Sequence, residues 1–134
     1  MTDKPASAPL VPVSWGELLD KVTILEIKRV RLPMASARTN AERELAGLTP
    51  ALAALEPLPE DLVRLKAALA DVNRRLWDIE DAIRTKEATS DFGAGFVALA
   101  RSVYRENDER GRIKQAINRL LRSPLVEEKY YAAY

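Results

Sequence analysis

The side chains that could carry chemistry in this 134-residue sequence are carboxylates, arginines, lysines and tyrosines, because histidine and cysteine are both absent. Their absence excludes Ser-His and Cys-His catalytic pairs and every zinc site built on histidine or cysteine. The five glycines are scattered and form no G-x-G-x-x-G turn for a dinucleotide. The sequence therefore predicts no catalytic residue, no metal ion and no cofactor.

Carboxylates are the first candidates for a site. Glu17 and Asp20 are spaced i, i+3 on a helix, and Asp78, Glu80 and Asp81 cluster further along the chain. Carboxylates that face one another across a helical bundle can hold Mg²⁺ against a polyphosphate, as in the all-α nucleotide pyrophosphohydrolases. That arrangement needs another acidic pair on the next helix, where the acidic residues lack the spacing. We therefore expect these carboxylates to lie in solvent.

Basic residues are the second candidates. They could bind a phosphate or a dicarboxylate, as in helical chorismate mutases. Acidic residues lie between them in the sequence, however, which favours ion pairs between the two kinds of residue on the helix surface. Lys plus Arg total 21 and Asp plus Glu total 20, and the resulting net charge of +1 argues against a nucleic-acid binder. The basic residues of the last predicted helix are Arg101, Arg105, Arg110, Arg112, Lys114, Arg119 and Arg122.

A polar block inside an apolar helical seam is the best candidate for a binding site. A hairpin that turns near residue 90 brings Asn73 opposite about residue 106 and Val72 opposite about residue 107. One interpretation is that the block fixes the register of the two helices, as a buried Asn does in a coiled coil. The other is that it forms a pocket in which Arg110 binds an anion. A third alternative is a rotated helix whose polar groups meet water. The predicted ligand-binding residues are Asn73, Trp77, Tyr104, Glu106, Asn107 and Arg110.

Two shorter helices precede this hairpin. A capping box that starts at Ser14 predicts a helix over 14–32, and its apolar residues on two sides make it a central element. A second capping box that starts at Thr39 predicts a helix to about residue 56. Because proline is tolerated in the first turn of a helix and not in its interior, we expect this helix to be broken or kinked at Pro50.

The hairpin itself follows from heptad spacing. Seven apolar residues recur at alternating intervals of three and four, which predicts a helix over about 59–88. The same spacing continues over about 91–122, where Asp91 is the expected N-cap and Gly111 leaves open whether the helix is continuous. The seven residues are Leu62, Leu65, Leu69, Val72, Leu76, Ile79 and Ile83.

These elements predict an all-α protein. We expect a helical bundle built on a long antiparallel, coiled-coil-like hairpin, with two shorter helices packed on it. Residues 1–13 form an extended leader, and residues 14–134 form a single helical domain. Within that domain, 34–58 is a variable connector with a broken helix, and 123–134 is an aromatic tail.

Three blocks of the sequence resemble a bacterial family that is catalogued only as a domain of unknown function. The blocks are PVSWGELLDKVTILEIK (residues 12–28), VNRRLWDIED (residues 72–81) and the stretch from DFG to YRENDER (residues 91–110). The resemblance implies a compact, free-standing bacterial helical protein. It implies no activity, so it transfers no catalytic residue to this chain.

The function that these observations favour is a non-enzymatic interaction or assembly module. Because the hairpin is longer than the two helices that could cover it, we expect a homodimer or a complex with another protein. The alternative is a small helical enzyme or binding protein that uses carboxylates and arginines on an anionic metabolite or a nucleotide. No stretch is long and apolar enough to span a membrane, and no targeting signal is evident, which predicts a cytoplasmic protein.

Overall fold

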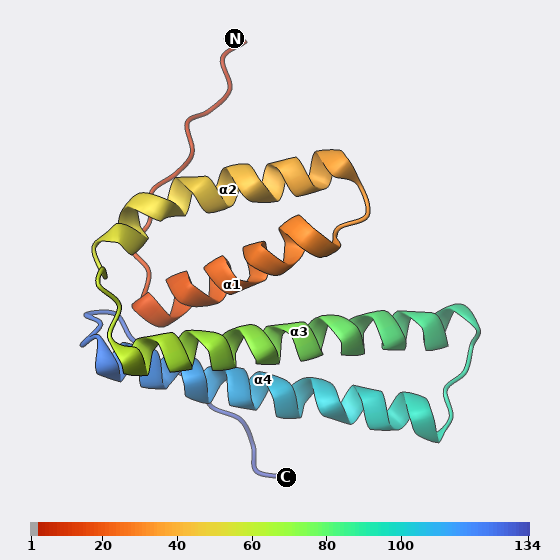
Figure 1. The fold of residues 1–134 in the computed structure, drawn as a ribbon. Helices are drawn as coiled ribbons and strands as arrows, with labels where there is room; N and C mark the ends of the chain where they lie inside the picture. Colours follow the sequence, from red (N-terminus) through yellow and green to blue (C-terminus); the bar gives the residue numbers. More distant parts are fainter. Residues whose placement is uncertain (1–2) are drawn as a thin grey trace.

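A computed structural model describes residues 3–134, and in this part of the chain it contains four helices and no strand. The helices are α1 (Trp15–Arg31), α2 (Ala35–Ala53), α3 (Glu60–Ala88) and α4 (Ala94–Leu120). Figure 1 shows α1 and α2 as one antiparallel pair and α3 and α4 as a second, longer pair, with α1 between α2 and the hairpin. The all-α prediction is confirmed.

Helix α1 is the central element, as its two apolar sides predict. Its N-cap is Ser14, whose hydroxyl accepts a hydrogen bond from the Glu17 amide at 3.1 Å. Helix α1 packs against α2, α3 and α4, and buries side chains in each direction. Its buried apolar residues are Leu18, Leu19, Val22, Leu25 and Ile27.

Helix α2 begins and ends at places that the sequence analysis did not predict. It starts at Ala35 rather than near Thr39, and no side chain caps its first turn. Instead, the Arg38 guanidinium donates to the carbonyls of Leu32 and Pro33, which holds the short turn between α1 and α2 closed. The predicted break is also wrong, because α2 runs through Pro50 and ends three residues later. Pro50 has no amide to donate to the carbonyl four residues earlier, and α2 ends within one turn of it.

The core lies at one end of the hairpin. Its residues come from α1, from the first half of α3 and from the second half of α4. From Arg74 to Arg110 the chain holds no buried residue, although apolar side chains continue at heptad spacing. In Figure 1 the tip of this half of the hairpin projects past the turn between α1 and α2. The core cluster consists of Leu19, Leu62, Leu69, Val72, Ile113 and Ile117.

Helix α4 begins later than predicted and is continuous. Its N-cap is Gly93 rather than Asp91, so Phe92 lies in the turn and is half exposed. The Asp91 carboxylate accepts from the Gly93 amide and from the Lys86 ammonium, so it stabilises the turn instead of the helix. Gly111 does not interrupt α4.

The chain has no helix or strand before α1 in the described residues and none after α4. Residues 123–134, here called the tail, pass back along α4. No helix among the described residues is long and apolar enough to cross a membrane.

Candidate functional site

The centre of the candidate site is Asp20, a carboxylate on α1 whose side chain is only 2% exposed. The Arg110 guanidinium on α4 pairs with both of its oxygens. Arg110 Nε donates to Oδ1 at 2.8 Å and Nη2 donates to Oδ2. This two-point geometry is the strongest form of an arginine–carboxylate pair, and it joins two residues that are ninety positions apart.

Two further side chains complete the hydrogen bonding around Asp20. Asn73 Nδ2 on α3 donates to Asp20 Oδ1 at 3.0 Å and to Thr23 Oγ1 at 2.9 Å. The Thr23 hydroxyl in turn donates to the Asp20 backbone carbonyl at 2.9 Å. Three helices therefore meet in one connected network, and the polar atoms that it buries have partners.

The charges in this network are mutually compensated. Burial would by itself raise the pKa of Asp20, but the hydrogen bonds from Arg110 and Asn73 and the charge of Arg110 lower that pKa below its ordinary value. The hydrogen bond to Asp20 raises the pKa of Arg110 further above its already high value. Asp20 is thus an ionised carboxylate at neutral pH, and it holds no proton to transfer.

A second ionic cluster lies one helical turn further along α4. Lys114 is buried, and its ammonium lies 2.7 Å from Glu17 on α1 and 2.7 Å from Glu127 in the tail. Burial would lower the pKa of Lys114, but the hydrogen bonds from its ammonium to the two carboxylates raise it overall. The same contact holds the pKa of Glu127 below its ordinary value. Lys114 therefore ties α1 and the tail to α4.

Helices α1 and α4 approach each other closely, which brings the side chains of both ionic clusters within reach of one another. The Gly16 amide donates to Asn118 Oδ1 at 2.7 Å, so the first turn of α1 lies directly on α4. A Cβ at Gly16 would lie 2.6 Å from the Lys114 carbonyl oxygen, which no side chain tolerates. On α4, Arg110, Lys114 and Asn118 recur at intervals of four and so present one polar stripe to α1.

The residues that the sequence analysis proposed are placed in three locations. Asn73, Trp77, Asn107 and Arg110 line one cleft of about 480 Å³ between α1 and the exposed half of the hairpin. Glu106 does not join them as the predicted polar layer requires, because it pairs with Arg75 at 3.0 Å.

Tyr104, the remaining residue of that proposal, belongs to a different surface. Its ring meets the ring of Tyr134 in the tail, with centroids 5.0 Å apart. Tyr104 and Glu106 therefore lie outside the cleft that holds the other four residues of the proposal.

Sequence reasoning did not assign Asp20, Thr23, Lys114 or Asn118 to the site. Asp20 was expected in solvent, and the structure corrects this because Arg110 and Asn73 together replace its water. The signal that could have found these residues is a polar stripe at helical spacing on an otherwise apolar helix. In α1 that stripe is Gly16, Asp20 and Thr23.

The arrangement can hold helices in register and can present a charged rim to a ligand. One edge of the Arg110 guanidinium remains outside the pair with Asp20, since Nη1 reaches only Asn107 Oδ1 at 3.5 Å. Among residues 3–134, no group of three or more acidic side chains is placed to hold a metal ion.

The sequence of residues 10–134 matches the model of a family described as a family of unknown function (DUF6165). The chain belongs to this family. No curated protein and no solved structure is detectably similar to it.

Proposed function

We propose that this member of a family of unknown function is a non-enzymatic assembly module that forms a homodimer through the exposed half of its hairpin. We call this half the distal hairpin and define it as residues 76–88 of α3 and 94–105 of α4. The buried network around Asp20 then serves to hold α1 in register on the other half.

One observation carries this proposal. The distal hairpin continues the heptad seam with Leu76, Ile79 and Ile83 on α3, yet no residue in it is buried. Two helices by themselves cannot remove a seam from water, because each covers only one side of the other. The apolar surface extends to the tip, where Phe92 and Phe96 stack edge to face at 5.3 Å and Val97 is half exposed.

Charge favours a second copy as the occupant of this surface. The α4 half of the distal hairpin contains Arg101 and Arg105 and no carboxylate, whereas the α3 half contains four carboxylates and two cations. Within residues 3–134, neither arginine forms an ion pair, and neither do Asp81 and Glu87 on α3. A two-fold axis would set the α3 of each copy against the α4 of the other and bring these charges together twice.

Sedimentation velocity over a range of concentrations tests the proposal. We expect a species of twice the 15.0 kDa chain mass. Val97→Glu, at a position 51% exposed in the distal hairpin, should weaken association at least about tenfold because it places a charge in the contact. Val63→Glu is the matched control, since Val63 is 49% exposed and lies at the opposite end of α3.

Either of two results contradicts the dimer. One is a 15.0 kDa monomer at the highest concentration. The other is an equal effect of the two glutamates, which would show that the distal hairpin has no special part in association.

The second candidate function is binding of an anionic metabolite or a nucleotide in the cleft of about 480 Å³. The observation that favours it is the lining, which contains the three cations Lys28, Arg84 and Arg110 and the aromatic residue Trp77. The same lining contains the carboxylates Glu80 and Asp81. A thermal-shift series with Mg²⁺ plus nucleotides or sugar phosphates should then raise the melting temperature.

Variants on α1 check that second function. Lys28→Gln should abolish the rise, because Lys28 lines the cleft, whereas Arg29→Gln should preserve it, because Arg29 is exposed and lies outside it. The absence of any rise in the unmodified chain excludes this second function and leaves the dimer proposal untouched.

A further inference from the structure

The tail and α4 of the same chain line an open hollow, which borders the distal hairpin at Val103 and Tyr104 and the cleft at Asn107. It measures about 530 Å³ and is lined from α4 by Val103, Tyr104, Asn107 and Asp108. From the tail it is lined by residues 131–134. A volume of this size is within the range of small-molecule sites.

Aromatic rings form the walls of this hollow. Three of the four tyrosines in the sequence line it, and they come from two separate segments, with Tyr104 on α4 and Tyr131 and Tyr134 in the tail. The rings of Tyr104 and Tyr134 stand at 72° to each other with centroids 5.0 Å apart, so two ring planes meet at a corner. The face of an aromatic ring carries negative electrostatic potential and attracts a cation.

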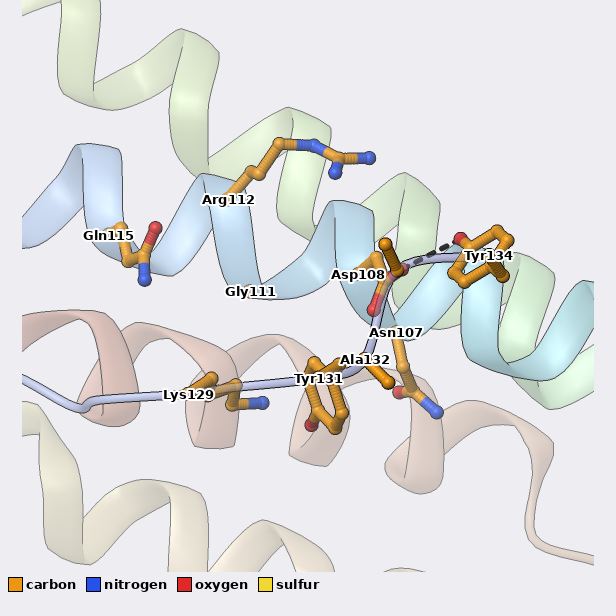
Figure 2. A pocket seen from close by; sticks show the side chains of 10 residues that line it. Asn107, Asp108, Gly111, Arg112, Gln115, Lys129, Tyr131, Ala132 and Tyr134 are labelled. Atoms are coloured by element: carbon orange, nitrogen blue, oxygen red, sulfur yellow. Dashed lines mark hydrogen bonds between the residues drawn. The ribbon is translucent and has the colours of Figure 1, made fainter.

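A carboxylate without a cationic partner lies beside these rings. The Tyr134 hydroxyl donates to Asp108 Oδ2 at 2.8 Å, and this bond is drawn as the dashed line in Figure 2. No ion pair within residues 3–134 reaches Asp108, and no hydrogen bond reaches its second oxygen. Asp108 is therefore available as the counter-charge for a cation held between the rings.

The positive groups nearby do not occupy the hollow. Arg112 and Lys129 line a second hollow of about 380 Å³, which overlaps the first because it shares Asp108, Tyr131 and Tyr134 with it. In Figure 2, Arg112 and Lys129 lie on opposite sides of Gly111. Arg112 pairs with Glu109, and Lys129 lies 3.5 Å from Glu127. Arg105 acts on the Tyr134 phenol through its charge, but it is exposed, so water and salt screen it.

We propose that this hollow binds a small organic cation, of the quaternary or methylated ammonium class, between the faces of Tyr104, Tyr131 and Tyr134 with Asp108 as its counter-charge. The methyl groups of such a cation fill an apolar, ring-lined space, and its diffuse charge needs no strong hydrogen-bond donor or acceptor. A compact ammonium that keeps its own water shell fits this lining less well. All of these residues belong to one chain, so the proposal does not require dimer formation, although Tyr104 lies at the edge of the distal hairpin.

Calorimetric titration of the full chain with choline tests the proposal, with 3,3-dimethylbutanol as the neutral molecule of the same shape. We expect choline to bind and the neutral analogue to bind at least about fivefold more weakly, because only the cation gains from the ring faces and Asp108. Equal affinity for the two molecules overturns the proposal, since it would show an apolar hollow with no preference for charge. No detectable binding of choline at tens of millimolar also overturns it.

Three variants locate the binding. Tyr131→Leu and Asp108→Asn should each weaken choline binding several-fold, because one removes a ring face and the other the counter-charge. Tyr130→Leu is the matched control, since Tyr130 is the neighbouring tail residue, is 92% exposed and does not line the hollow. An unchanged affinity in both of the first two variants would move the site elsewhere and contradict the assignment. Circular dichroism should show an unaltered fold in all three, because each position lies on the surface.

Discussion

A carboxylate that has lost nearly all contact with water must be matched by other groups, and the Asp20 carboxylate is matched by the Arg110 guanidinium and the Asn73 amide. The contribution of the intact cluster to stability differs greatly from the cost of removing one of its members. The intact cluster contributes little net stability, because the cost of removing the charges from water offsets most of their attraction. Removal of one member costs much more, because the other members remain buried without a partner.

Substitution of Arg110 should therefore be severe. We expect Arg110→Met to lower the free energy of unfolding by about 3–5 kcal/mol, since Asp20 is left as an unpaired buried charge. Arg112→Met is the control, because Arg112 is exposed and pairs only with Glu109 on its own helix, and it should cost under about 1 kcal/mol. Urea denaturation measures both. Similar small losses in the two variants would show that Asp20 has another way to be satisfied.

The same residue predicts how stability depends on pH. The pKa of Asp20 is lower in the folded chain than in the unfolded chain. The stabilising contribution of its ionised form is therefore complete above its unfolded pKa of about 4 and is lost as the pH falls through the folded value. The unfolding free energy of the unmodified chain should exceed that of Asp20→Asn at pH 7, and the difference should shrink in acid. A difference that stays constant below pH 4 would contradict this assignment.

At the scale of elements, contact between α1 and α4 depends on a glycine at one position. Gly16→Ala should destabilise the chain by more than about 1 kcal/mol, because its methyl group would collide with the Lys114 backbone carbonyl, which cannot move without shifting α4. Gly47→Ala is the matched change in α2. It meets nothing within 4 Å and should instead stabilise the chain by up to about 1 kcal/mol through helix propensity. Thermal or urea unfolding should show changes of opposite sign.

The sequence predicts an element well when the residues that determine it lie within that element, and poorly when they lie elsewhere in the chain. The boundaries of α3 agree with the heptad pattern to within one residue, because the pattern lies within the helix itself. The start of α2 was not predictable from a capping box, since Arg38 closes the preceding turn by contacts with carbonyls outside the helix. The burial of Asp20 was the least predictable feature, because its partners Asn73 and Arg110 come from two other helices.

At the scale of the whole molecule, packing is uneven along the long axis of the hairpin. The core cluster occupies one end, and the distal hairpin is covered only in part, because the end of α1 reaches it through the ion pair of Arg31 with Asp78 at 2.6 Å and none of the distal hairpin's residues is buried. Local stability follows burial, so the two ends should open with different free energies. The end that holds Leu69 and Ile117 is expected to open only with the whole fold.

Hydrogen exchange measured at several concentrations should reveal this difference. In dilute solution we expect the amides of the distal hairpin to exchange much faster than those around Leu69 and Ile117. As the concentration rises, dimer formation should slow exchange in the distal hairpin alone, because it is the surface that becomes covered. Exchange rates in the distal hairpin that do not change with concentration would contradict the dimer and would not affect the cation site.

The pair between Asp20 and Arg110 also constrains how the chain can be made. Ninety residues separate the two partners, so at translation rates of roughly 5–20 residues per second Asp20 waits about 5–18 s for its guanidinium. Helices α1 and α2 can meet each other during that interval, but α1 cannot bury its carboxylate until α4 has been synthesised. Glu127, the second carboxylate on Lys114, comes later still. A nascent chain of this protein therefore emerges from the ribosome with its central helix unfinished, and its final packing is a late step in biosynthesis, when a chaperone has had time to bind.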